Sequence, residues 1–284
     1  MNTPSIGQDD QGHSSRKGQQ RIPEVQAQQQ PQVEPVEQQS PINFELSALK
    51  RRALNEFPLC LPNYKKSLPG TFRNTGTTIK FVPNIPKTEW PQMSSQLFNQ
   101  DFRFVGYHFH WSQGMDGSEH ALGGLKYVAE LHMVHEGLRN ASEMAVLGVF
   151  LTIENASTPD NAKMVFSKEE TDALKQLVHC GQTVTIGGDH TLSSKLPDNN
   201  SQEVSSSSNM DHPASPFLRY QGSLTTHPYT EGVTWTMFTD PLVITEEQMS
   251  LLRLVRDSDG KRIEKNYRTI QSTNGREVLF FTKE

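Results

Sequence analysis

The chain has 284 residues, of which 34% are hydrophobic, and its 27 basic and 32 acidic side chains give a formal net charge of −5. This charge balance argues against nucleic-acid binding, which normally requires a basic face. No run approaches the roughly 18 apolar residues that a membrane span requires. We therefore expect neither a nucleic-acid partner nor a membrane-spanning segment.

Residues 1–38 differ in composition from the rest of the chain. They are rich in Gln, Pro, Glu and Ser and almost lack aromatic or long apolar side chains. Because such a segment cannot bury enough surface to offset the entropy of ordering it, we expect a disordered tail. The remainder, residues 39–284, is expected to form one domain.

Two features bear on the cellular compartment. No secretory signal is visible at the N-terminus, and Cys60 and Cys180 are expected to be separate buried thiols, which fit a reducing compartment. These features predict a cytoplasmic protein. Three Asn-x-Ser sequons, which matter only in a secreted protein, lie at Asn140, Asn155 and Asn199.

The domain shows a repeated strand pattern. Apolar and polar residues alternate with a period of two over residues 102–110, 127–135 and 146–153. Clusters of Gly, Pro, Asn and Ser bound these runs, which is typical of strands joined by turns. We therefore expect a mainly β domain with short helices.

Two short helices are expected later in the chain. One covers residues 168–179, which begin with acidic side chains and end with a basic one. The other covers residues 245–257 and begins with a capping-box pattern, in which Gln248 follows Thr245 by three positions. Between the two helices, the polar stretch over residues 196–214 is expected to be a long surface loop.

Five of the ten histidines fall between positions 108 and 135. His108 and His110 are two apart within a strand pattern, so their imidazoles point to the same face. If the strand that contains His132 pairs with this one, three neutral nitrogens can bind one ion and leave the fourth position to water, as in catalytic zinc sites. A lone His-x-His is more often an ordinary surface or core feature, but Glu130, close to His132, strengthens the case for a metal.

The segments around these histidines resemble the α-class carbonic anhydrases in order and spacing. The matching motifs run collinearly through most of the chain; they are Gln39–Asn43 (QSPIN), His108–Trp111 (HFHW), Gly117–His120 (GSEH), Ala129–His135 (AELHMVH), Ala145–Phe150 (AVLGVF), Gly222–Thr226 (GSLTT), Val233–Trp235 (VTW) and Asn266–Arg268 (NYR). Several unconnected motifs in register make the resemblance highly specific. It implies a large, twisted, mostly antiparallel central sheet with short helices.

The resemblance also implies a metal site. His108, His110 and His132 would bind one Zn²⁺, and Glu130 would orient His132 through the other ring nitrogen of that histidine. In this family zinc lowers the pKa of its bound water to about 7. The resulting hydroxide attacks CO₂ and yields bicarbonate.

Further residues match the family's catalytic surroundings. Thr225 would accept the hydrogen bond of the hydroxide and donate its own proton to Glu119. His120 would make a structural hydrogen bond in the core, and His135 would lie near the metal without binding it. A mainly apolar pocket would hold CO₂, although plain core packing is the alternative interpretation of its residues, which are Val134, Val146, Leu224, Thr226, Val233 and Trp235.

Three positions depart from the family pattern. Fast members have a histidine that relays the proton to buffer, where this chain has Thr77, which cannot titrate near pH 7. Gly106 stands where many members have a glutamine that hydrogen-bonds the first ligand, so His108 would lack that support. His227 replaces the usual proline; a tolerated change is the simpler interpretation, and a substitute for the missing shuttle is the sharper hypothesis.

The resemblance therefore predicts a zinc-dependent lyase, a monomeric carbonate dehydratase slowed by loss of the shuttle histidine. CO₂ and bicarbonate would be its ligands, sulfonamide-type compounds its inhibitors, and one-carbon metabolism and pH homeostasis its context. The alternative is a catalytically weak or silent carbonic-anhydrase-related module with a binding or structural role. Silent relatives typically lose a zinc histidine, whereas all three are present here, which favours the enzyme.

Overall fold

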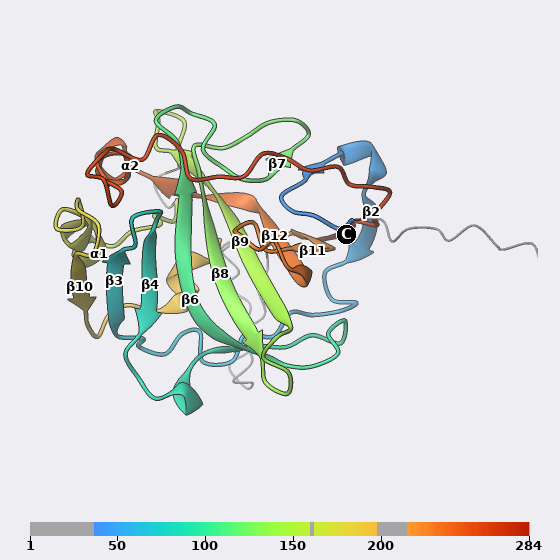
Figure 1. The fold of residues 1–284 in the computed structure, drawn as a ribbon. Helices are drawn as coiled ribbons and strands as arrows, with labels where there is room; N and C mark the ends of the chain where they lie inside the picture. Colours follow the sequence, from blue (N-terminus) through green and yellow to red (C-terminus); the bar gives the residue numbers. More distant parts are fainter. Residues whose placement is uncertain (1–36, 160–161, 198–214, 284) are drawn as a thin grey trace, which may run out of the picture. The chain divides into compact units, whose positions relative to one another are not determined.

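The computed structural model describes residues 37–159, 162–197 and 215–283. Nearly all of the expected tail, residues 1–38, lies outside this range, as do residues 198–214 of the expected surface loop and the sequon at Asn199. All described elements belong to one compact unit, Val36–Glu284 (Figure 1).

A twisted, 11-stranded sheet runs through this unit (Figure 1). Its spatial order is β10-β3-β4-β6-β8-β9-β12-β11-β13-β2, with β5 paired to β6. Neighbouring strands are antiparallel except in the β9–β12 and β13–β2 pairs, which confirms the expected fold. In chain order the strands are β2 (Lys50–Ala53), β3 (Gly70–Asn74), β4 (Ile79–Pro83), β5 (Gln92–Met93), β6 (Phe102–Trp111), β8 (Ala129–Gly137), β9 (Met144–Ile153), β10 (Thr183–Ile186), β11 (Phe217–Ser223), β12 (Glu231–Ile244) and β13 (Leu279–Thr282).

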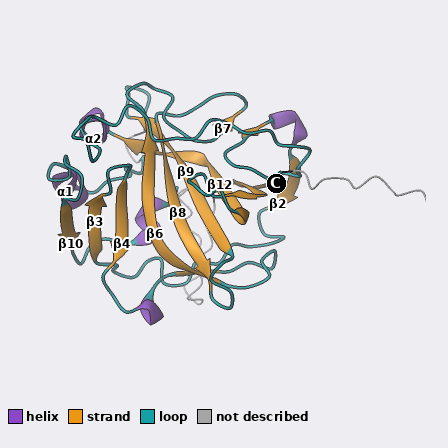
Figure 2. Cartoon of the chain, viewed as in Figure 1, coloured by secondary structure: helices purple, strands orange, loops and turns teal. Residues whose placement is uncertain are grey.

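The smaller elements lie around the sheet (Figure 2). A separate pair of short parallel strands joins the N-terminal segment to the loop before β8. These smaller elements are β1 (Asn43–Phe44), β7 (Ala121–Leu122), the 3₁₀ turns η1 (Leu46–Ala48), η2 (Lys87–Glu89) and η3 (Leu192–Lys195), and the helices α1 (Lys168–Leu174) and α2 (Glu246–Arg253).

Both expected helices form, and both begin with a capping box. Thr245 and Gln248 exchange side-chain and backbone hydrogen bonds at the start of α2, as predicted, and Ser167 does the same with Glu170 at the start of α1. Both helices are shorter than predicted, because the chain after Leu174 and after Arg253 continues in tight turns with bonds between residues three apart.

A β-bulge in β6 determines which side chains share a face. The register with β8 shifts between Phe104 and Gly106, so the alternation changes parity there. Phe104 and Tyr107 consequently both pack in the larger apolar cluster. Beyond the bulge, His108 and His110 alternate with Tyr107 and Phe109, which pack in that cluster, so both histidines project from the opposite face of the sheet.

The expectation of buried cysteines is wrong. Cys60 and Cys180 are both free, but Cys60 is half-buried and Cys180 is exposed. Cys180 lies just before Gly181 in the turn that leads to the edge strand β10, where no core is available to cover it. Among the described residues, no helix is both long and apolar enough to cross a membrane.

Candidate metal centre

Three histidines converge on one face of the central sheet. β6 and β8 pair so that His108 lies directly opposite His132 and His110 lies opposite Glu130. The ring centroids are 4.9 Å apart for His108 and His110, 5.3 Å for His108 and His132, and 4.4 Å for His110 and His132. One nitrogen of each ring lies within 4.8 Å of one from both others. The predicted ligands are therefore brought together.

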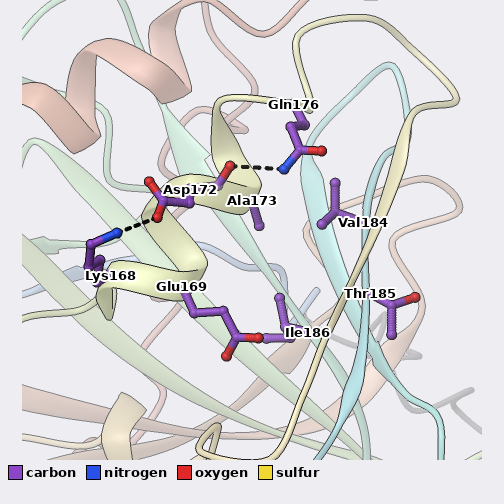
Figure 3. Close-up of a pocket in the computed structure, with 8 residues that line it drawn as sticks. All are labelled: Lys168, Glu169, Asp172, Ala173, Gln176, Val184, Thr185 and Ile186. Carbon is purple, nitrogen blue, oxygen red and sulfur yellow. Dashed lines mark hydrogen bonds and ion pairs between the residues drawn. The ribbon is translucent and has the colours of Figure 1, made fainter.

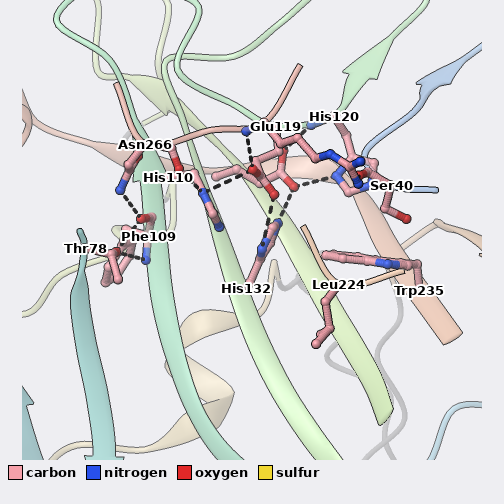
Figure 4. Close-up of polar contacts among 12 residues, drawn as sticks. Ser40, Thr78, Phe109, His110, Glu119, His120, His132, Leu224, Trp235 and Asn266 are labelled. Atoms are coloured by element: carbon pink, nitrogen blue, oxygen red, sulfur yellow. Dashed lines mark hydrogen bonds and ion pairs between the residues drawn. The ribbon is translucent and has the colours of Figure 1, made fainter. Parts of the chain in front are cut away.

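Glu130 and His120 fix the orientation of His132; the two histidines are labelled in Figure 4. Glu130 Oε1 accepts from His132 Nε2 at 2.6 Å and from His120 Nδ1 at 2.7 Å, and Oε2 accepts from the His120 backbone N–H at 2.9 Å. Because an ionised carboxylate only accepts, His132 Nε2 holds its proton and Nδ1 keeps a free lone pair. His120, Glu130 and His132 form a second group of possible metal ligands. The hydrogen bonds among these three side chains already occupy the atoms that would bind a metal there.

The charge of Glu130 is stabilised in spite of complete burial. Burial raises the pKa of Glu130, but the charges and hydrogen bonds of His120 and His132 outweigh it and hold the pKa well below its usual range. The hydrogen bonds continue from His120 Nε2 to the Tyr220 hydroxyl at 2.6 Å and from there to Ser40 Oγ at 2.8 Å. The N-terminal motif thus supports the site from a distance.

His110 provides the test of whether a metal fits. Its Nδ1 donates to the carbonyl oxygen of Asn266 at 2.8 Å, so Nε2 of the neutral ring has a free lone pair. This Nε2 is buried and has no hydrogen-bond partner in the described part of the chain. A buried polar atom without a partner is costly, and a cation between the three histidines would supply one. Neutral imidazoles are preferred ligands of Zn²⁺, so the donor set fits zinc.

His108 has the least support of the three. No hydrogen bond joins its ring to any residue that the structure describes, and Gly106 has no side chain to offer. Burial and the charges of His110, His132 and Lys80 lower the pKa of His108 well below its usual range. Burial also lowers the pKa of His110. Both rings are therefore neutral at pH 7, as metal binding requires.

Glu119 lies beside the histidines and keeps one free oxygen. Its Oε1 is 3.4 Å from His110 Nδ1 and accepts from the backbone N–H of Arg268 at 2.7 Å. Its Oε2 is 3.9 Å from His132 Nδ1, is buried, and has no hydrogen-bond partner among the described residues. Thr225 is also buried, in the turn after β11, but no hydrogen bond joins it to Glu119 in the described structure.

Most residues of the predicted apolar pocket pack in one cluster beside His132, as either a pocket wall or plain core packing would require. The Trp235 ring lies 4.8 Å from the His132 ring and is anchored by a hydrogen bond from Nε1 to the Ser223 carbonyl at 2.9 Å. Leu224 lies next to Trp235 in Figure 4. Five of the six predicted pocket residues belong to this cluster, namely Val134, Val146, Leu224, Val233 and Trp235.

A cavity of about 560 Å³ opens beside His108 and His110, which line it together with Thr77 and the exposed Thr226. His227 is exposed and is not among its lining residues. A second cavity of about 420 Å³ lies between α1 and β10 and shares no lining residue with the first (Figure 3).

Two residues that act on the candidate ligands were given no role by the sequence analysis. Asn266 binds His110 through its carbonyl, and its side chain accepts from the Trp111 N–H at 2.7 Å and donates to the Thr77 carbonyl at 3.0 Å. The only available signal was its place in the Asn266–Arg268 motif. Lys80, whose charge reaches His108, lies outside every matching motif.

The comparisons with known proteins agree with this geometry. A family model described as eukaryotic-type carbonic anhydrase matches residues 26–282. The chain is 37% identical over 242 residues to a Caenorhabditis elegans protein named "Putative carbonic anhydrase 3", covering 85% of this chain and 89% of that relative. It is 29% identical over 257 residues to carbonic anhydrase 6 of Mus musculus, covering 85% of this chain and 73% of the relative.

Proposed function

Since the chain belongs to the eukaryotic-type carbonic anhydrase family, we propose that it is a zinc enzyme that reversibly hydrates CO₂. In the forward direction the oxygen of water forms a bond to the carbon of CO₂, and bicarbonate and one proton leave. His108, His110 and His132 would hold the metal. When bound, zinc lowers the pKa of water to about 7, the established value for this family, and so supplies a nucleophile at neutral pH.

The position of the ring proton in His110 and His132 supports the proposal most strongly. In His110 and His132 one ring nitrogen is committed to a fixed acceptor, the Asn266 carbonyl and the Glu130 carboxylate respectively. The opposite nitrogen of each ring is left with a lone pair. Because a metal binds only the unprotonated nitrogen, this arrangement pre-sets both rings as ligands and limits the rearrangement that metal binding needs.

Thr225 and Glu119 would orient the nucleophile. The free Oε2 of Glu119 is suited to accept a hydrogen bond from the Thr225 hydroxyl. A hydroxyl that donates its one proton in this way can only accept from other groups. The nucleophile must then donate its proton to Thr225 and direct a lone pair away from it, toward CO₂.

The apolar cluster would hold CO₂ beside the nucleophile. CO₂ has no net dipole and offers weak acceptors, so a wall of Val146, Val233, Leu224 and Trp235 excludes competing water without demanding hydrogen bonds. The Trp235 ring contacts both the apolar cluster and the His132 ring. The substrate pocket therefore adjoins the metal position.

Proton release would limit turnover. Thr77 lines the cavity beside His108 and His110 but cannot relay a proton near pH 7, whereas an imidazole at that position could. Exposed His227, in the turn after Thr225, would partly replace the missing relay. If His227→Ala leaves the dependence of turnover on buffer concentration unchanged, this part of the proposal is wrong.

Stopped-flow CO₂ hydration on the zinc-loaded chain tests the proposed function. We expect hydration that an aromatic sulfonamide inhibits, and we expect His110→Ala to abolish both hydration and zinc binding. His179→Ala, which removes an exposed histidine outside the site, is the matched control and should leave both unchanged. One bound zinc without sulfonamide-sensitive hydration would identify a silent module instead.

A further inference from the structure

A lysine side chain lies on the same face of the sheet as the candidate ligands. Lys80 in β4 is the direct cross-strand partner of His108 in β6. Directly opposed residues of an antiparallel pair project from the same face of the sheet. The next pair, Phe81 and Tyr107, packs into the larger apolar cluster on the opposite face. Lys80 therefore shares the face of His108.

Gly106 leaves room for the stem of this lysine. A Cβ atom placed on Gly106 would lie 3.5 Å from Lys80 Cε and 2.7 Å from the carbonyl oxygen of Phe81. The methylene stem of Lys80 thus passes beside Gly106, two residues before His108 in the same strand. The Lys80 stem therefore fills the space that a side chain at position 106 would take.

The ammonium group of Lys80 has no ion-pair partner among the described residues. No ion pair or hydrogen bond joins it to any residue in the described part of the chain. Its charge acts on His108 from the same face. Lys80 therefore places a cation beside the first candidate ligand, where its effect on His108 opposes that of the Glu130 carboxylate.

The rim of the cavity has the same sign of charge. Its charged lining residues are three cations, Lys261, Arg262 and Lys265, and two acids, Asp257 and Glu264. Asp257 Oδ1 accepts from two backbone N–H groups of its own turn but keeps its charge, and Lys261 Nζ lies 3.9 Å from Asp259 Oδ2. The lining thus holds one more cation than acid, in a chain whose net charge is −5.

We propose that Lys80 is a specificity-determining residue that favours small anions at the metal position, bicarbonate among them. This inference rests on the proposed function, because the anion is held beside the metal that the three histidines bind. The apolar cluster on the other side of the site supplies no charge, whereas the carboxylates of Glu119 and Glu130 beside the histidines oppose an anion, and the charge of Lys80 acts against theirs. Because Lys80 is exposed and water screens its charge, we expect its attraction for a monoanion on the same face to change the anion dissociation constant by only about fivefold.

Thiocyanate binding to the cobalt(II)-loaded chain tests the proposal, because the visible absorption of cobalt changes when an anion joins its ligands. We expect Lys80→Gln to raise the thiocyanate Kd about fivefold and Lys80→Arg to keep it near the original value. Lys168→Gln removes the same charge on α1, where the side chain lines only the second cavity, and should leave the Kd unchanged.

The outcomes separate this inference from the proposed function. If the unaltered chain binds cobalt and thiocyanate but Lys80→Gln has the same Kd, Lys80 does not select anions and the metal site stands. If Lys168→Gln weakens binding as much as Lys80→Gln, the effect is one of net charge and the inference is overturned. If the unaltered chain binds no cobalt, the metal site itself is wrong, and the inference falls with it.

Discussion

Replacing Glu130 by glutamine should weaken zinc binding and also destabilise the fold. The carboxylate accepts three hydrogen bonds, from His132 Nε2, His120 Nδ1 and the His120 backbone N–H. Glutamine offers one oxygen and one NH₂ group in the same place, so at least one buried N–H faces another donor. Leaving a buried donor unsatisfied costs about 1–3 kcal/mol of folding free energy.

The loss of zinc affinity has a separate cause. Without a firm acceptor at Nε2, His132 is free to move its proton to Nδ1, the nitrogen that should bind the metal. Loss of such an outer partner typically weakens metal binding about 10–100-fold, which corresponds to about 1.4–2.7 kcal/mol. Glu130→Gln should therefore lower zinc affinity by this factor even after its effect on folding is taken into account.

Two measurements on each variant separate these effects. Competition with a chromogenic chelator at pH 7.5 gives the zinc Kd, and urea unfolding of the metal-free chain gives the folding free energy. Glu136→Gln is the matched control, because Glu136 is on the same strand but pairs with Arg103 and touches no candidate ligand. A Glu130→Gln chain that unfolds more easily but binds zinc within twofold of the original would refute the reasoning.

Four further predictions follow from the same structure. Thr77→His should raise buffer-dependent CO₂ hydration at least about tenfold, since an imidazole relays protons near pH 7; equal rates at all buffer concentrations would contradict it. Gly106→Ala should lower the urea-unfolding free energy by about 1–3 kcal/mol, because its Cβ would lie 2.7 Å from the Phe81 carbonyl oxygen. Burial lowers the pKa of His135 to about 3, so the unfolded chain binds a proton below pH 6.5 that the folded chain refuses. Stability should therefore fall as the pH falls from about 6.5 to 3, by up to about 1.4 kcal/mol per pH unit from this group. Since the buried Tyr64 hydroxyl is hydrogen-bonded to His135 Nε2, the double replacement His135→Phe and Tyr64→Phe should make that slope measurably shallower. Removing zinc with a chelator should lower the unfolding free energy by about 4 kcal/mol relative to a sample with free zinc at a thousand times its Kd, and an unchanged melting temperature would exclude a specific site.

Local patterns in the sequence were sufficient to predict the ligands and the helix starts. Side chains two apart on a strand share a face when no bulge lies between them. This local rule was enough to predict that His108 and His110 point the same way. The Thr245 and Gln248 capping box is equally local. The collinear motifs then supplied what spacing could not, namely that His132 lies on the neighbouring strand.

Long-range geometry could not be predicted in this way. Strict alternation over residues 102–110 would place Phe104 and His108 on one face, and only the bulge before Gly106 separates them. Asn266 meets His110 from 156 positions away, and no local pattern records such a partner. Lys80 becomes relevant only once β4 is known to pair with β6 in this register.

Zinc content and CO₂ hydration measured on the same sample test the central claim most directly. Elemental analysis should give one zinc per chain, and stopped-flow assay of that material should show hydration that falls to the uncatalysed rate when one equivalent of a tight-binding sulfonamide is added. A chain that is folded but takes up no zinc, or that binds one zinc and leaves the hydration of CO₂ at the uncatalysed rate, would contradict the account.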